Sequence, residues 1–275
     1  MIELPEARTI SKDLKKEILW KTIRDIWGNY TDHKFTFYYS DPNKYKDYLI
    51  WKKITNIIER NFYVEIEIED YKLIFRDWVG IRYYENKELM PKKSKLFIEF
   101  DDESFINCTV TMYWCIAVFK INEDMKNEYY NIELNWIWAL DKEFTFEYFK
   151  NLINEDTKKL SAKAFLATEQ RILWIWNWVL QDILFNAKIH PKTKVKDLSS
   201  SQIQDLYNSI INTLKIMIQW GWRDTEKNIY WTYWKYKTIL SSKNYKEWCP
   251  NCRSEIKKEN YLWWSIYYCP SCQKN

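Results

Sequence analysis

Apolar side chains recur with two different periods along the chain, and the period changes near the middle. In the first half, apolar and polar residues alternate, most regularly from Tyr63 to Ile68. A period of two predicts strands with one buried face. We expect strands in the runs KTIRDI, KFTFYY, KKITNIIE, YVEIEIE, YKLIF, GIRYY, KLFIEF and INCTVTMYWCIAVF. Residues 1–125 are therefore expected to form an antiparallel β-sandwich or barrel-like sheet.

Apolar residues at helical spacing occur before and among these strands, and they predominate in the second half of the chain. We expect helices over residues 5–19, 43–50, 143–153, 161–170, 178–188 and 199–219. Ser199, followed by Gln three residues later, is typical of a helix start. The pattern predicts a helical unit over residues 143–240, ending in a hairpin-like segment at 229–240, and a small unit at 245–275. The fold class expected for the whole chain is thus α+β with several domains.

Tryptophan stands at many positions where the backbone pattern favours glycine. The chain has 3 Gly and 17 Trp, whereas ordinary usage of roughly 7% predicts about 19 glycines. Trp20 and Trp51 each follow a helical pattern, at the position where glycine ends many helices. Trp174, Trp176 and Trp178 alternate through a segment that should turn and then open a helix. We hypothesise that the gene uses UGA as a glycine codon; an unusually Trp-rich aromatic core is the alternative.

Charge and hydropathy exclude a membrane span and indicate an anionic partner. Apolar runs stay short of the 18 or more residues that a span needs, and the start of the chain does not read as a signal peptide. We therefore expect a cytoplasmic, nucleoid-associated protein. Residues 188–275 carry 15 Lys and Arg against 7 Asp and Glu. This basic third favours contacts with phosphates, and a solvated basic surface is the alternative.

The six cysteines fall into two groups. Cys108 and Cys115 lie in a strand-like apolar stretch and are expected to be buried thiols. The other four form two Cys-x-x-Cys pairs with 16 residues between them, Cys249, Cys252, Cys269 and Cys272. Each pair can place two thiolates on one tetrahedral ion, which predicts a structural Zn²⁺ site. Disulfides are the alternative.

Four segments resemble one protein family when tryptophan is read as glycine. They are MIELPEARTI, LATEQRI…NAKIHP, RDTEKNIY…KTILS and CPNC…YYCPSCQ. Their order and spacing are similar to those of the formamidopyrimidine-DNA glycosylase and endonuclease VIII family. The resemblance implies an N-terminal β-sandwich, a helix–two-turn–helix domain and a C-terminal zinc finger, with double-stranded damaged DNA as partner of a monomer. It also implies excision of oxidised bases in base excision repair, by base flipping and with abasic-site lyase activity.

The resemblance also assigns roles to individual residues. Glu3 and Glu6 match the acids of the N-terminal motif, where the N-terminal amine attacks the sugar and Glu3 handles protons. Without the resemblance both acids read as helix N-terminal carboxylates. Asn177 matches an asparagine that holds a DNA phosphate, and Trp174 and Trp176 precede it in the same turn. Lys163 matches a phosphate-binding lysine less closely, because its spacing from Asn177 differs by one residue from that in the family.

Three departures from the family pattern bear on activity. Ile2 stands where the family has proline, so Met1 is expected to remain in place. Phe62 falls where a sandwich lysine is usual, and Trp263 where the zinc finger carries an arginine. Two functions stay open: a glycosylase with weakened lyase activity, or a non-catalytic module that binds damaged DNA. A zinc-ribbon protein acting on RNA would leave the Leu-Pro-Glu start unexplained.

The glycine hypothesis predicts the codons of the gene. We expect UGA at the tryptophan positions, which sequencing of the coding DNA reads directly. UGG at Trp20, Trp51 and Trp174 would exclude the hypothesis and leave the aromatic-core alternative.

Overall fold

The chain folds into two compact units, and one short segment from the second half of the chain belongs to the first unit. The computed structural model describes residues 2–29, 36–60, 63–86, 88, 91, 94–123 and 136–274. One unit comprises Met1–Asn135 with Glu226–Trp234, and the other Trp136–Thr225 with Lys235–Asn275. Residues 226–234 lie within the range predicted for the helical unit, yet they pack with the sheet. The division into 1–125, 143–240 and 245–275 itself stays a prediction.

Helix α1 (Leu4–Ile18) confirms the first predicted helix. Pro5 lies in its first turn, and Glu3 and Glu6 form a reciprocal capping box in which the Glu3 backbone N–H donates to Glu6 Oε2 at 3.3 Å. Leu14 and Ile18 are fully buried, as the helical spacing predicts. α1 packs against β3 (Ile54–Glu59) and β4 (Val64–Ile68).

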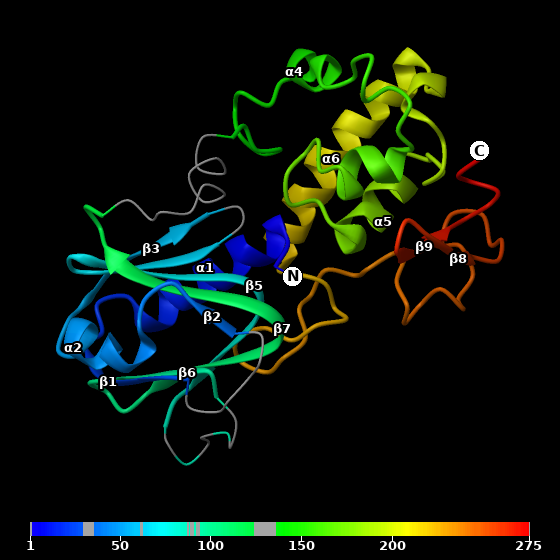
Figure 1. Cartoon of the computed structure of the whole chain (residues 1–275). Coiled ribbons are helices and arrows are strands. Elements are labelled where there is room, and N and C mark those ends of the chain that lie inside the picture. Colours follow the sequence, from blue (N-terminus) through cyan, green and yellow to red (C-terminus); the bar gives the residue numbers. More distant parts are fainter. Residues whose placement is uncertain are drawn as a thin grey trace. The chain divides into compact units, whose positions relative to one another are not determined.

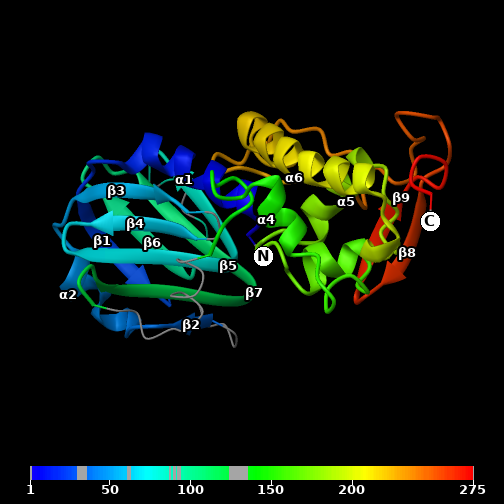
Figure 2. The same cartoon turned by 90° about the horizontal axis from the view of Figure 1, so that it is seen from above.

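One seven-stranded sheet forms the first unit (Figures 1 and 2). The main strand order is β1-β6-β7-β5-β4-β3, with β2 (Thr36–Tyr38) paired to β7 outside it. The remaining bounds are β1 (Ile23–Gly28), β5 (Tyr71–Tyr84), β6 (Leu96–Phe100) and β7 (Phe105–Lys120), with η1 (Pro42–Lys44) and α2 (Tyr45–Leu49) between β2 and β3. The sheet is antiparallel except for the parallel pair β2–β7. The predicted antiparallel sandwich class is confirmed.

Two long strands join the two layers of this sandwich. The runs YKLIF and GIRYY, predicted as separate strands, are one strand, β5, paired with β7 along its length. The register shifts between Asp77 and Val79, and such an irregularity lets a long strand bend. Figure 1 shows β5 and β7 running from the layer with β3 to the layer with β6. Local periodicity could not reveal this continuity, because it depends on pairing between distant segments.

Helices are the main regular structure of the second unit. They are α4 (Phe146–Asn151), η3 (Ala164–Thr168), α5 (Asn177–Asn186), η4 (Val195–Asp197) and α6 (Ser200–Trp220). The predicted capping box of α6 is present: Ser199 Oγ accepts from the Gln202 N–H at 3.2 Å. The η3 helix has the wide π-type winding. The ribbon at the end of the chain is a hairpin of β8 (Lys257–Tyr261) and β9 (Trp264–Tyr268).

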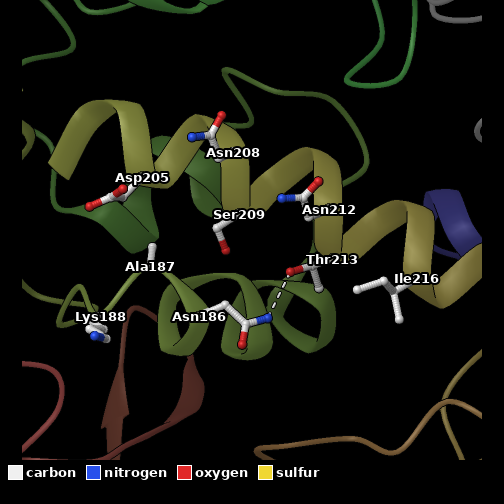
Figure 3. A pocket seen from close by; sticks show the side chains of 9 residues that line it. All are labelled: Asn186, Ala187, Lys188, Asp205, Asn208, Ser209, Asn212, Thr213 and Ile216. Atoms are coloured by element: carbon white, nitrogen blue, oxygen red, sulfur yellow. Dashed lines mark hydrogen bonds between the residues drawn. The ribbon is translucent and has the colours of Figure 1, made fainter. Parts of the chain in front are cut away.

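Helices α5 and α6 pack directly on each other. Ser209 Oγ of α6 donates to the Ile183 carbonyl at 2.7 Å, and Asn186 Nδ2 of α5 donates to Thr213 Oγ1 at 3.0 Å. Figure 3 shows the Asn186–Thr213 bond between the two helices, among the residues of a pocket that Asn208 and Asn212 also line. These side-chain bonds fix the register of α6 along α5.

The predicted hairpin at 229–240 is wrong in detail. Within the part of the chain that the structure describes, this segment contains isolated bridges, Lys227 with Tyr233 and Arg223 with Tyr236, and no named strand. The Tyr83 N–H donates to the Ile229 carbonyl at 2.8 Å, and Tyr230 OH donates to Glu17 Oε1 at 2.7 Å. Long-range bonds to the sheet unit thus replace the local strand pairing.

No helix among the described residues is long and apolar enough to cross a membrane.

Five described tryptophans have the left-handed backbone that favours glycine. They are Trp20, Trp51, Trp174, Trp231 and Trp263, with φ between 61° and 71°. Trp20 and Trp51 lie just past the ends of α1 and α2, as the helix-ending pattern predicts. The indole N–H groups of Trp176 and Trp222 are buried without a hydrogen-bond partner among the described residues. Strain and orphaned donors both support glycine as the residue that this fold requires.

Replacing Trp20 or Trp51 by glycine is expected to stabilise the protein. Each substitution removes a left-handed non-glycine residue, which costs roughly 1–2 kcal/mol, and exposes no core, because the side chains are 62% and 70% exposed. After the larger entropy loss of glycine, a gain of about 1 kcal/mol remains. Thermal unfolding measures it.

Phe97→Gly is the control in the same unit, at a position that is not tryptophan. Phe97 lies in β6, is fully buried, and its ring packs against Trp27 at a centroid distance of 4.9 Å. Its loss is expected to lower the free energy of unfolding by about 2 kcal/mol or more. A similar loss for Trp20→Gly and Trp51→Gly would contradict the glycine interpretation.

Candidate nucleic-acid interface

The first candidate residues lie at the start of α1. Ile2 and Glu3 are 2% and 1% exposed, and Glu6 is partly buried. Burial raises the pKa of Glu6 to about 8, and the nearby charge of Glu226 acts in the same direction. Glu6 is therefore protonated near pH 7 and can donate a proton. Met1 lies outside the described residues.

The second candidate group lies in the turn before α5. Trp174 is 3% exposed with φ 61°, whereas Trp176 is extended, so one of the two has the glycine-like backbone. Their rings meet edge to face at 5.9 Å. Asn177 is the first residue of α5, and its Nδ2 donates to the Ser265 carbonyl of β9 at 3.0 Å. The structure thus brings the turn, the helix N-terminus and the ribbon hairpin together.

Lys163 lies inside the protein, against the turn of the same hairpin. It is 1% exposed, and its Nζ donates to the carbonyls of Tyr261, Leu262 and Trp264, the last two at 3.5 and 3.3 Å. Burial lowers its pKa to about 8. In this arrangement the ammonium holds the β8–β9 turn. Its predicted contact with a DNA phosphate stays a prediction.

Four cysteines converge at the base of the ribbon. The Sγ atoms of Cys249, Cys252, Cys269 and Cys272 all lie within 4.8 Å of one another. The Cys249–Cys272 and Cys252–Cys269 pairs are 3.8 and 3.4 Å apart. Four sulfurs at about 2.3 Å from one tetrahedral ion are about 3.8 Å apart, so the set fits Zn²⁺. Cys108 is buried as predicted, and the side chain of Cys115 is outside the described residues.

Polar side chains on the buried face of α5 attach the ribbon and the loop before it. Gln181 Nε2 donates to the Ser265 carbonyl at 3.2 Å, and Gln181 Oε1 accepts from the Tyr267 N–H at 3.1 Å. Asp182 accepts from Tyr236 OH at 2.9 Å and from the N–H groups of Ile239 and Leu240 at 3.1 and 2.9 Å. The sequence analysis missed both residues. The sequence feature that could have identified them is a pair of polar residues within an otherwise apolar helix.

Of the two positions at which a family cation is replaced, the structure describes one. Trp263, at the place of the zinc-finger arginine, is 96% exposed with φ 70° at the tip of the ribbon hairpin. A tryptophan at this tip offers no cation to a phosphate. Phe62 lies outside the described residues.

Comparisons with known proteins agree with this arrangement. Residues 138–228 match the family model for the formamidopyrimidine-DNA glycosylase H2TH domain. The chain is similar to the formamidopyrimidine-DNA glycosylases of Lactococcus lactis subsp. cremoris, at 26% identity over all of both chains, and of Cytobacillus firmus, at 22% identity over 99% of this chain and 100% of the relative.

Solved structures show the same fold. The Lactococcus lactis Fpg in complex with DNA containing an abasic site superposes with a TM-score of 0.82 at 22% identity, over 99% of this chain and 100% of that one. The same enzyme with DNA containing an oxidised pyrimidine gives 0.81 at 23% identity, over the same shares. The predicted architecture of sandwich, helix–two-turn–helix domain and four-cysteine ribbon is therefore confirmed.

Cys252→Ser is expected to remove zinc and to unfold the ribbon. Three remaining thiolates hold the ion far more weakly, and the fold of a small zinc unit depends on its metal. Zinc per chain, measured by atomic absorption, should fall at least tenfold, while the circular dichroism of the sheet unit persists. Ser271→Ala is the matched control on the second knuckle: it removes only the hydroxyl, which bonds to Ser254 Oγ at 2.7 Å, and keeps the backbone N–H that bonds to Cys269. Equal zinc contents would rule out the four-cysteine site.

Proposed function

Because this chain belongs to the formamidopyrimidine-DNA glycosylase and endonuclease VIII family, we propose that it is a DNA glycosylase of base excision repair that removes oxidised bases from duplex DNA. The observation that carries the proposal is the alignment of the entire chain with DNA glycosylases, including the H2TH domain. We propose that the protein acts as a monomer. Its fold supplies one helix–two-turn–helix domain and one ribbon per chain.

DNA contacts are proposed for the second unit. Asn177 begins α5, where the helix dipole favours a phosphate. Of the basic third, Lys257 and Lys258 lie in β8 and Lys192 pairs with Glu259 of β8. Phosphate contacts position the duplex without reading its sequence. A structural Zn²⁺ held by the four cysteines would keep the hairpin rigid beside α5, and its part is limited to that.

The chemistry is proposed for the two acids of α1. Glu3 accepts a proton from a water whose oxygen bonds to the sugar C1′. The bond between C1′ and the base nitrogen breaks, and the electron pair leaves with the base. Glu6, protonated because burial and Glu226 raise its pKa to about 8, gives the leaving base a proton. Atoms and charge balance without any covalent bond to the protein.

A Schiff base requires the N-terminal amine instead. Proline at the second position would give a secondary amine after removal of Met1, but this chain has Ile2, whose side chain is 2% exposed. A retained Met1 places a primary amine one residue farther from Glu3. A misplacement of about 1 Å can cost roughly a hundredfold in rate. We therefore propose that base excision outlasts lyase activity.

Ile2 also supports the second candidate function, a non-catalytic module that binds damaged DNA. A chain without the family's usual nucleophile would still bind DNA through its H2TH domain. Base release distinguishes the two functions.

Duplexes carrying an oxidised purine, an oxidised pyrimidine or an abasic site test the proposal. We expect base release from at least one oxidised duplex, with little trapping by borohydride on abasic DNA. Glu3→Gln should lower base release at least a hundredfold, because general-base catalysis contributes about 10²–10⁴-fold. Product is measured on denaturing gels after alkaline cleavage of the abasic strand.

Glu17→Gln is the control, since it removes another acid of α1 and can still accept the hydrogen bond of Tyr230. It should leave base release unchanged. Efficient borohydride trapping by protein with Met1 in place would refute the lyase part. Tight binding of every duplex with no base release would establish the non-catalytic module.

A further inference from the structure

The second unit contains a small pocket at the start of α5 that the residues assigned so far do not explain. Its volume is about 170 Å³, and it is lined by the first turns of α5, by β9, by the loop around Ser241 and by Arg223. At about 30 Å³ per water molecule, it has room for roughly five waters or the oxygens of a phosphate group.

Arg223 gives this pocket its charge. No acidic side chain occurs among the described residues that line it, and Arg223 is the charged one. The residue is 5% exposed, and its guanidinium stacks over the ring of Trp178 with 4.9 Å from Cζ to the ring centroid. The other polar lining groups include Asn177, at the positive end of the α5 dipole, and Ser242, which is exposed. A buried cation among hydroxyl and amide groups favours an anion.

The backbone of Arg223 is held in place by bonds that lead back to α5. The Asp224 N–H donates to the Tyr236 carbonyl at 2.8 Å, and the Tyr236 N–H donates to the Trp222 carbonyl at 3.3 Å. Tyr236 OH in turn donates to the buried Asp182 at 2.9 Å. Arg223 therefore reaches the pocket from a fixed position, and little side-chain entropy remains to be lost when an anion binds.

We propose that Arg223 is a DNA-contacting residue that binds one backbone phosphate beside the N-terminus of α5. The inference rests on the proposed function, because it takes the anion to be a phosphate of duplex DNA. Arginine suits this place better than lysine, since its planar fork can donate two parallel hydrogen bonds to one phosphate. The contact is independent of the base that is excised.

Salt dependence of DNA binding tests the proposal directly. Arg223→Gln should weaken binding of a duplex with an abasic-site analogue about tenfold at 0.1 M salt. The slope of log K against log salt should fall by about 0.9, as expected for one lost phosphate contact. Undamaged duplex should show the same change in slope. Lys150→Gln is the control: it removes one cation of α4 that is 49% exposed and paired with Glu147 at 3.1 Å, outside both the pocket and the basic third. Its slope should stay unchanged.

The remaining outcomes distinguish a failure of the Arg223 phosphate contact from a failure of the proposed function. An unchanged slope in a folded Arg223→Gln protein would overturn the phosphate contact and leave the proposed function standing. If that variant does not fold, Arg223→Lys decides: a phosphate contact predicts several-fold weaker binding at an unchanged slope, and unchanged affinity would overturn it. Absence of DNA binding by the unaltered chain would overturn both proposals.

Discussion

The attachment of two distant segments to one face of α5 determines the architecture of the second unit. Gln181 binds β9 of the ribbon, and its neighbour Asp182 binds the loop at 236–240. Burial raises the pKa of Asp182 to about 6, while its hydrogen bonds and the charge of Arg223 act against that rise. A buried carboxylate is stable only with such partners. The turn, the ribbon and Arg223 are consequently held around the start of one helix.

The ribbon depends on more than its cysteines. Lys163 holds the carbonyls at the hairpin turn, and Gln273 Nε2 donates to the Ile189 carbonyl at 2.9 Å. Lys192 pairs with Glu259 of β8. These contacts hold the ribbon and the residues after it from two segments of the helical unit, at Lys163 and at 189–192, whereas a zinc ion would fix only the base of the ribbon. Packing contacts therefore hold the ribbon against the helical unit, and a zinc ion bound by the four cysteines would stabilise its base in addition.

Tryptophan is tolerated in this fold in unequal ways. Trp20, Trp51 and Trp263 project into solvent from left-handed positions, so their cost lies in the backbone. Trp222 is fully buried, and its indole N–H has no hydrogen-bond partner among the described residues. Trp178 supports the guanidinium of Arg223, and a glycine there would open the pocket further. The same substitution thus strains turns, fills a core position and narrows a proposed phosphate site.

Local pattern determined much of this protein from the sequence alone. Period-two runs located the strands, the Ser199–Gln202 spacing located the start of α6, and Cys-x-x-Cys spacing located the ribbon, because each depends on neighbours in the chain. The helix-ending positions of Trp20 and Trp51 also needed only local geometry. Tertiary structure decided the rest: β5 is one strand because β7 pairs along it, and residues 226–234 join the sheet through Ile229 and Tyr230. It also buried Lys163 and brought Arg223 beside Asn177, since those contacts join segments far apart in sequence.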